Sequence, residues 1–195
     1  MKLLLVKTSS LGDLVHAMPA ITEAAREVPN LIVDWVVEED LVPVARLHPN
    51  VRRVIPIAIR RWRRNLLSSP FNNIQEVSAF KQKVQQEAYD LIIDSQGLLK
   101  SAAVARLAKG KIHGFNRHSA REGPASSLYH QTHHIPKNQH ATHRQKQLFA
   151  ATLNYKTNTS LDYGLTNHHN LPTNQPNNPF QTNISLENNS PLEGE

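Results

Sequence analysis

Short apolar runs alternate along the chain with longer segments in which apolar residues recur every three or four positions. A short continuous apolar run predicts a strand that is covered on both faces, as in parallel sheets. The longer spacing predicts a helix with one apolar face. Strands are therefore expected at residues 2–6, 32–37, 53–57, 89–94 and, with a weaker pattern, 111–115.

Helices are expected between and after these strands, at residues 14–28, 41–47, 73–88, 98–108 and 140–153. In the first helix Pro19 lacks an N–H and crowds the preceding turn, so the helix either kinks there or has its regular part begin near Pro19. Asn73 and Glu76 have the spacing of a capping box, and Gly110 is placed as a helix stop. The pattern assigns no element to residues 127–135.

The alternation of strands and helices predicts an α/β fold with a parallel sheet. The first βαβ crossover is expected to be right-handed, which makes residues 2–6 and 32–37 parallel neighbours. From residue 157 onward asparagine, proline, threonine and serine dominate and the apolar periodicity ends. Such a segment buries too little apolar surface to offset its conformational entropy. We therefore expect one domain over residues 1–156 and a disordered tail over residues 157–195.

The polar loop Lys7-Thr8-Ser9-Ser10-Leu11-Gly12-Asp13 follows the first strand and opens the first helix. Ligands of α/β sheets bind at the carboxyl ends of strands, where loop amides and helix N-termini converge. The loop lacks the glycine spacing and the lysine of a phosphate-binding P-loop. At a helix N-terminus, Asp13 is stabilised as a carboxylate that can accept a proton from a sugar hydroxyl group. The alternative is that Asp13, like Ser10, only caps the helix.

Two further groups of polar residues carry candidate chemistry. Asp94 and Gln96 follow the fourth strand and so fall on the same edge of the sheet as the loop, where they either contact a ligand or cap the next helix. His140 and His143 have helical spacing. Because no acidic or thiolate residue lies near these histidines in the sequence, we expect no metal site.

The formal net charge of +6 favours an anionic partner, which is a nucleic acid, a phosphorylated small molecule or an anionic lipid. No signature of nucleic-acid recognition supports the first of these. The region between Asp40 and Glu76 has no acidic residue and holds an arginine cluster formed by Arg52, Arg53, Arg60, Arg61, Arg63 and Arg64. The cluster is either a clamp for carboxylates and phosphates or a solvated charged loop. Trp62 either stacks on a sugar or base or packs in the core.

Two observations bear on the compartment. The absence of cysteine excludes disulfides, thiolate metal sites and thiol catalysis, and it is compatible with a reducing environment. The apolar start of the chain is interrupted by Lys7 and is too short for a signal peptide or a membrane span. We therefore interpret residues 2–6 as a buried strand of a cytoplasmic protein.

Several separated motifs occur together: residues 6–13 with Pro19-Ala20, residues 34–39, residues 53–63, residues 94–102 and residues 133–135. In their order and spacing they resemble the type I lipopolysaccharide heptosyltransferases, ADP-heptose-dependent members of glycosyltransferase family 9. The resemblance runs from Met1 to about Tyr155. The Arg-Arg-Trp-Arg stretch favours type I over type II.

The resemblance implies a GT-B architecture, in which two Rossmann-like domains, each a three-layer α/β domain with a parallel sheet, enclose the active site. In this family the N-terminal domain holds the acceptor, the Kdo residue of the inner core on lipid A, and the C-terminal domain holds ADP-heptose. Carried over by motif, Asp13 is the general base for inverting displacement of ADP. The residues implied to bind the acceptor are Ser9, Ser10, Arg60, Arg61, Arg63, Arg64, Gln96 and Arg121.

The resemblance fades after Tyr155, so we expect residues 1–156 to be the acceptor-binding domain and the donor-binding domain to be absent. This implies an inactive acceptor half of a heptosyltransferase, from a truncated or frame-shifted gene, peripheral on the cytoplasmic face of the anionic inner membrane. ADP-heptose is the donor substrate of the full-length family, and we expect no cofactor and no nucleic-acid partner. The alternative is a non-catalytic binding module that uses the arginine cluster to hold an anionic glycolipid or another polyanion.

Overall fold

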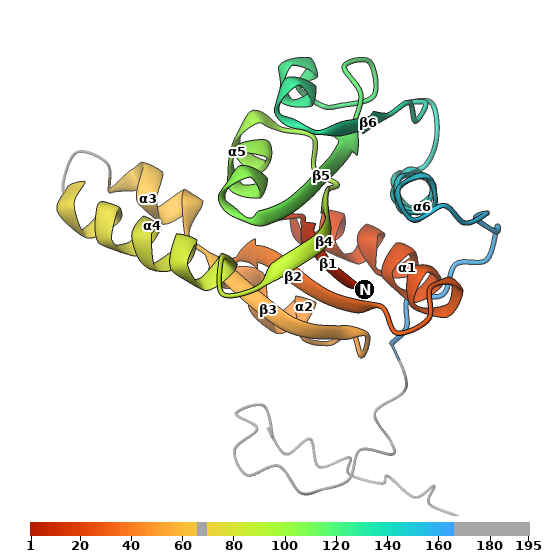
Figure 1. The fold of residues 1–195 in the computed structure, drawn as a ribbon, viewed down its shortest axis with the longest axis horizontal. Coiled ribbons are helices and arrows are strands. Elements are labelled where there is room, and N and C mark those ends of the chain that lie inside the picture. Colours follow the sequence, from red (N-terminus) through yellow and green to blue (C-terminus); the bar gives the residue numbers. More distant parts are fainter. Residues whose placement is uncertain (66–69, 166–195) are drawn as a thin grey trace, which may run out of the picture. The chain divides into compact units, whose positions relative to one another are not determined.

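A parallel sheet forms the centre of the computed structural model, which describes residues 1–65 and 70–165 (Figure 1). Every strand pair in it is parallel, and the strand order is β3-β2-β1-β4-β5-β6. The strands are β1 (Lys2–Val6), β2 (Ile32–Glu38), β3 (Val51–Ile57), β4 (Ala88–Asp94), β5 (Lys109–Phe115) and β6 (Gln131–His133). The chain starts in the middle of the sheet, runs outward to β3 and then returns to β4 beside β1. The strand order therefore reverses between β1 and β4, where ligands of open α/β sheets bind.

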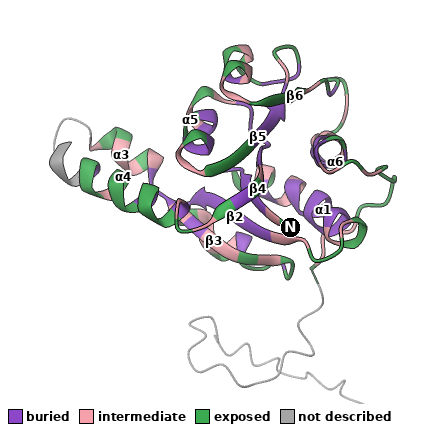
Figure 2. Ribbon diagram, in the orientation of Figure 1, coloured by how far each residue is buried: buried purple, intermediate pink, exposed green. Residues whose placement is uncertain are grey.

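Helices cover both faces of the sheet, and the side chains of β1 alternate between the two. Leu3 and Leu5 pack with residues of one helical layer, whereas Leu4 and Val6 pack with those of the other. The first layer contains α1 (Leu11–Glu27), α2 (Val42–Ala45) and α6 (Ala141–Leu153), and the second contains α4 (Pro70–Val84) and α5 (Leu99–Leu107). Figure 2 shows most of β2 and the inner side of α1 as buried, whereas β3 and the start of β5 carry intermediate and exposed residues. The predicted three-layer α/β fold with a parallel sheet is confirmed.

The predicted strands are confirmed with small changes at their ends, and the unassigned region contains β6. Three short elements complete the described chain: η1 (Glu39–Leu41), α3 (Ile59–Arg64) and η2 (Gly123–Leu128). The strand β6 has three residues and a polar sequence, so it lacks the apolar run that revealed the other strands. Helix α1 extends without a break from Leu11 and contains Pro19, so its regular part does not begin near Pro19.

The capping box predicted at Asn73 and Glu76 is wrong, because α4 begins at Pro70 and both residues lie inside the helix. Asn73 Nδ2 instead donates to the carbonyl group of Trp62 at 3.1 Å, and Glu76 Oε2 accepts from Trp62 Nε1 at 2.6 Å. The apolar face predicted for this helix is buried at Phe80, but Ile74 is 65% exposed. The reason is that the outer part of α4 extends beyond the sheet beside α3 (Figures 1 and 2).

The helix stop predicted at Gly110 is also wrong, since α5 ends at Leu107 and Gly110 lies in β5. Glycine is required there by a close backbone approach. A Cβ atom at this position would lie 2.5 Å from the carbonyl oxygen of Tyr89 in the neighbouring strand β4.

The compact unit extends to Leu165 and does not end at residue 156, so the predicted domain boundary is too early. Two buried charges hold this additional segment. Lys146 Nζ donates to the carbonyl oxygens of Asn158 at 2.7 Å and Ser160 at 2.6 Å, and Glu23 Oε1 accepts from the Asn158 amide at 2.8 Å. Residues 157–165 therefore pack through buried polar partners, together with Tyr163, which lies against the core. Residues 166–195 of the expected tail lie outside the described residues.

A pair of histidines connects the edge strand β6 to its neighbour β5. This pair leads to a prediction about how the stability of the protein depends on pH. His113 Nδ1 and His133 Nε2 share a hydrogen bond of 3.1 Å, and their rings are stacked. Burial lowers the pKa of His113 to about 4, from an ordinary value of 6.5. Between these two values the unfolded chain binds more protons than the folded one, so stability that is present at neutral pH is lost on acidification.

We expect the free energy of unfolding to fall less between pH 7 and pH 4.5 in His113→Gln than in the wild type. The expected difference is about 1–2 kcal/mol, because water near the sheet edge screens part of the effect. Urea unfolding at the two pH values measures it, with the exposed His118→Gln as the control. Equal losses in His113→Gln and the wild type would contradict the assignment.

Candidate functional site

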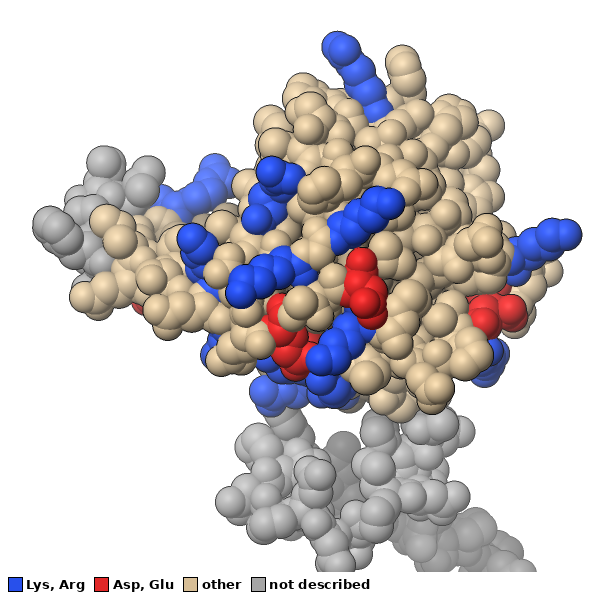
Figure 3. All heavy atoms as spheres, viewed as in Figure 1, with Lys and Arg blue, Asp and Glu red and all other residues tan. Residues whose placement is uncertain are grey.

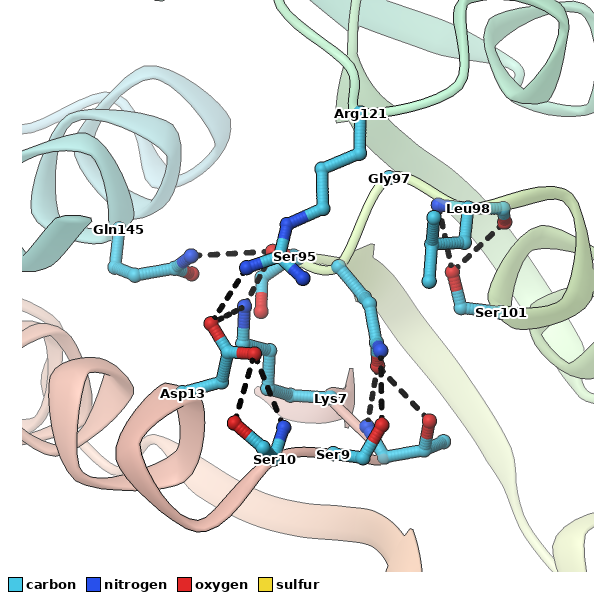
Figure 4. Close-up of polar contacts among 12 residues, drawn as sticks. Lys7, Ser9, Ser10, Asp13, Ser95, Gly97, Leu98, Ser101, Arg121 and Gln145 are labelled. Atoms are coloured by element: carbon cyan, nitrogen blue, oxygen red, sulfur yellow. Dashed lines mark hydrogen bonds and ion pairs between the residues drawn. The ribbon is translucent and has the colours of Figure 1, made fainter. Parts of the chain in front are cut away.

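Asp13 lies at the N-terminus of α1 and uses its two carboxylate oxygens differently (Figure 4). Oδ2 accepts hydrogen bonds from the Ser10 backbone amide at 3.0 Å and from the Ser10 hydroxyl group at 3.4 Å. Oδ1 accepts from an Arg121 Nη at 2.8 Å and lies 3.6 Å from Lys7 Nζ. Asp13 therefore caps the helix, but it does more than cap, because the same carboxylate also faces two cations.

The cations around Asp13 determine its charge. Burial raises the pKa of the Asp13 carboxyl group, but Lys7, the Ser10 amide and Arg121 oppose this, and the net result is a pKa below the ordinary value. Burial lowers the pKa of Lys7 to about 8, although Asp13 partly offsets this effect. At neutral pH the site therefore holds a carboxylate beside an ammonium group and a guanidinium group.

Gln96 joins the loop after β1 to the loop after β4. Its Oε1 accepts from the Thr8 amide at 2.8 Å and from the Thr8 hydroxyl group at 2.9 Å. Its Nε2 donates to Ser9 Oγ at 3.2 Å. Ser9 and Gln96, both predicted to line the acceptor side, are thus brought together, and both are largely buried. In the described structure the hydrogen bonds of their side chains connect the loop after β1 to the loop after β4.

Asp94 is fully buried and organises the loop that contains Gln96. Its Oδ2 accepts from the hydroxyl groups of Tyr129 and Ser101, each at 2.8 Å, and its Oδ1 accepts from the amides of Gln96 and Gly97. Burial raises the pKa of Asp94, which its hydrogen-bond donors oppose. The side chain is therefore committed to holding the loop.

The loop that carries Arg121 lies directly on the turn after β4. Gly97 has a φ of +70°, and a Cβ atom there would lie 3.2 Å from the Arg121 amide. The Glu122 amide donates to the Gly97 carbonyl group at 2.9 Å. This close approach carries Arg121 to Asp13 across 108 positions of sequence.

A small cavity of about 30 Å³ adjoins Asp13, and its volume suits one water molecule. Its lining includes Lys7, Ser95, Gln96, Arg121, Arg144 and Gln145. Ser95 Oγ and Gln145 Oε1 are buried and have no hydrogen-bond partner among the described residues. Sequence reasoning assigns no role to four of these lining residues: Lys7, Ser95, Arg144 and Gln145. Lys7 belongs to the polar loop and Ser95 lies between Asp94 and Gln96, whereas Arg144 and Gln145 give no local signal.

The arginine cluster divides into three groups, of which the first two are paired with carboxylates. Arg52 and Arg53 bind the buried carboxylate of Asp34. Arg61 binds Glu39 at 2.9 Å and Glu76 at 2.7 Å.

The remaining arginines of the cluster, Arg60, Arg63 and Arg64, are exposed on α3, which follows β3 and thus lies at the same edge of the sheet. No hydrogen bond or ion pair joins them to Asp13 within residues 1–65 and 70–165. On the face shown in Figure 3, Lys and Arg side chains are more widespread than Asp and Glu side chains.

Trp62 lies beside a larger cavity of about 240 Å³, which Ile57, Arg61 and Phe80 also line. Its ring packs edge-on against Phe80 with a centroid separation of 6.3 Å. Its indole N–H donates to Glu76. These contacts favour the packing role of Trp62 over the stacking role.

Two features of the described part of the chain bear on other classes of function, metal binding and membrane spanning. No three His, Cys, Asp or Glu side chains gather there in a way that could hold a metal ion. His140 caps α6, since its Nδ1 accepts from the Thr142 amide. None of the helices in this part of the chain has the length and apolar character needed to cross a membrane.

Comparisons with known proteins agree with one another. The sequence model of glycosyltransferase family 9 (heptosyltransferase) matches residues 77–188. Lipopolysaccharide heptosyltransferase 1 of Escherichia coli K12 is 49% identical over 177 residues, which cover 89% of this chain and 55% of that protein. The corresponding enzyme of Pseudomonas aeruginosa is 50% identical over 167 residues, covering 85% and 46%.

Among solved structures, E. coli heptosyltransferase WaaC with ADP-2-deoxy-2-fluoro heptose superposes with a TM-score of 0.80 at 47% identity, over 85% of this chain and 52% of that one. The chain thus spans about half the length of the relatives it matches. The family match reaches residue 188, which corrects the expectation that the resemblance ends near Tyr155. The resemblance of residues 157–188 was not recognisable from the sequence pattern because asparagine, proline, threonine and serine dominate there.

Proposed function

This chain belongs to glycosyltransferase family 9, and on that premise we propose that its domain is the acceptor-binding half of a lipopolysaccharide heptosyltransferase I. The proposed reaction moves heptose from ADP-heptose to the Kdo residue of the lipopolysaccharide inner core. One observation carries the proposal: a carboxylate held at a helix N-terminus, beside two cations, at the point where the strand order reverses. This is a suitable place for a base that must act on a hydroxyl group of an anionic sugar.

In the proposed mechanism the carboxylate of Asp13 accepts the proton of the acceptor hydroxyl group. The hydroxyl oxygen then forms a bond to the anomeric carbon of heptose, and the bond from that carbon to ADP breaks with its electron pair leaving on ADP. Attack from the side opposite to ADP inverts the anomeric centre. Because Lys7, the Ser10 amide and Arg121 hold the pKa of Asp13 low, the base is ionised at neutral pH.

We assign recognition of the acceptor's carboxylates and phosphates to the exposed arginines of α3, Arg60, Arg63 and Arg64, together with Arg121. Guanidinium groups bind such anions through paired hydrogen bonds. Arg61 stays in the proposed set, but it must share its guanidinium group with Glu39 and Glu76. Ser9, Ser10 and Gln96 shape the loops beneath the acceptor.

The acceptor is a lipid, so the proposed working place is the cytoplasmic surface of the inner membrane, where basic side chains favour anionic headgroups. The 195 residues correspond to about half of each relative. We therefore propose that this chain, assayed alone, binds the acceptor without transferring heptose. Release of ADP from ADP-heptose in the presence of Kdo-lipid A measures this, and heptose transfer by the chain alone would contradict it.

The proposal is tested by comparing two variants for binding to Kdo-lipid A. Arg60→Ala with Arg63→Ala is expected to weaken binding at least about tenfold and to make it less salt-dependent, because two charged contacts are lost. Asp13→Ala is expected not to weaken binding, because a base acts on the proton and its carboxylate makes no attractive contact with an anionic group of the acceptor. Arg117→Ala, an exposed arginine on another loop, is the control.

Two results would go against the proposal. If Asp13→Ala weakened binding as much as the arginine changes, the base assignment would lose its support. If a polyanion without a sugar acid, such as inorganic polyphosphate, bound as tightly as Kdo-lipid A, the binding-module alternative would be favoured.

A further inference from the structure

Hydrogen-bond donors and cations surround both oxygens of the carboxylate proposed as the base. A carboxylate offers about four lone-pair positions for hydrogen bonds. At Asp13 the amide and hydroxyl group of Ser10 occupy Oδ2 and Arg121 occupies Oδ1, while the Lys7 ammonium group forms an ion pair with Oδ1 at 3.6 Å. Because the Asp13 side chain is only 13% exposed, an acceptor hydroxyl group reaches it most readily in the place of one of these groups.

The four donors differ in their freedom to move. The Ser10 contacts belong to the cap of α1. The Lys7 side chain is 3% exposed, and its ammonium group also donates to the Ser95 carbonyl group at 3.2 Å. The Arg121 side chain is 52% exposed, and in the described part of the chain its guanidinium group makes a hydrogen bond only to Asp13. Arg121 is thus the donor that can leave at least cost.

A charged group is needed to draw Arg121 away, because a neutral hydroxyl group does not match the strength of a guanidinium–carboxylate hydrogen bond. The surroundings suit a second anion. Arg144 lies close enough for its pKa to be lowered by Arg121, after the larger effect of burial. Lys7, Arg121 and Arg144 together line the small cavity, in which Asp13 is the one acidic side chain. The excess of positive charge there attracts an anion.

We propose that Arg121 covers the Asp13 carboxylate in the free protein and is drawn off it by an anionic group of the acceptor, while Lys7 stays in place. This rests on the proposed function, since it presumes that Asp13 is the base. It makes Arg121 a residue that determines specificity: only an acceptor that brings a negative charge uncovers the base. Lys7 is a positioning residue that keeps the carboxylate ionised and oriented after Arg121 has left.

The test is an NMR titration of the 195-residue protein, which needs no transfer activity. The probes are the methyl glycoside of Kdo, which carries a carboxylate, and the methyl ester of the same glycoside, which is neutral. The signals followed are the side-chain carboxyl carbon of Asp13, the Nε–H group of Arg121, and the backbone amides as a report of binding. The variant is Arg121→Gln, and Arg117→Gln on the same loop is its matched control.

In the wild type and in Arg117→Gln, the carboxylate probe is expected to move the Arg121 signal and to raise the pKa of Asp13, whereas the ester does neither. In Arg121→Gln the pKa of Asp13 is expected to be higher from the start and to respond much less to the probe. The response that remains measures the direct repulsion between the two carboxylates.

Two results overturn the inference. If the amides report binding but the Arg121 signal stays unchanged, or if Arg121→Gln responds like the wild type, Arg121 does not uncover the base and the proposed function survives. If no signal responds to the carboxylate probe, acceptor binding itself is contradicted and the inference falls with it.

Discussion

Replacing Asp34 by alanine is expected to lower the free energy of unfolding by about 3 kcal/mol, because it removes a fully buried carboxylate that accepts four hydrogen bonds, three of them from guanidinium groups. Asp34 is 0% exposed. Its carboxylate accepts from Arg52 at 3.0 and 2.8 Å, from Arg53 at 3.0 Å and from the Tyr89 hydroxyl group at 2.7 Å. Without it, the Tyr89 hydroxyl group loses its acceptor, and Arg52 and Arg53 lose their shared carboxylate although each keeps another side-chain acceptor. Urea unfolding at neutral pH measures the loss.

Asp40→Ala is the matched control, because Asp40 is an exposed carboxylate near the same strand. A loss in Asp34→Ala no larger than in the control would show that the network adds nothing to stability. Folded Asp34→Ala protein is expected to keep its affinity for Kdo-lipid A, since Arg52 and Arg53 serve the fold and the exposed arginines of α3 serve the acceptor. The two measurements together separate the structural arginines from the binding ones.

Lys146→Met is expected to cost about 3 kcal/mol for the same physical reason, at the other end of the domain. Lys146 is 1% exposed. Its ammonium group holds the carbonyl oxygens of Asn158 and Ser160 and lies 3.5 Å from Glu23. Methionine keeps much of the apolar stem but leaves these acceptors without a donor. Urea unfolding of the full chain measures the loss.

A double-mutant cycle is the control for the prediction on Lys146→Met. Glu23→Gln combined with Lys146→Met is expected to be less destabilised than the sum of the two single changes, because the remaining buried charge is also removed. The exposed Lys156→Met is expected to change stability little. If Lys146→Met behaved like Lys156→Met, residues 157–165 would not be part of the cooperative unit.

The fold was predictable because its evidence is local. Each of the first five strands has a short apolar run, and helical spacing between the runs requires parallel neighbours. The position of Asp13 follows from the same logic, since a polar loop between a buried strand and a helix must lie at the edge of the sheet. The exception is β6, whose polar residues at the end of the sheet carry no such signal.

The partners of charged residues were not predictable, because they come from distant parts of the sequence. Arg61 stands in a run of basic residues, yet its partners Glu39 and Glu76 lie 22 and 15 positions away. The sequence pattern alone does not show that Arg52 and Arg53 meet Asp34. Nor does composition reveal that a segment rich in polar residues packs on two buried charges, Glu23 and Lys146. The fold decides which charged residues form pairs, and the number of charges in a sequence does not show this pairing.

The most direct test of the central claim, that this domain holds the acceptor of a heptosyltransferase I, is its affinity for two lipid surfaces that differ only in Kdo. Vesicles of one phospholipid composition carry either Kdo-lipid A or lipid A without Kdo, and binding is measured at physiological salt. The account predicts binding to the Kdo-bearing vesicles that is tighter by at least about tenfold, since the sugar acid adds charged contacts to Arg121 and the α3 arginines. Equal affinity for the two surfaces would contradict it.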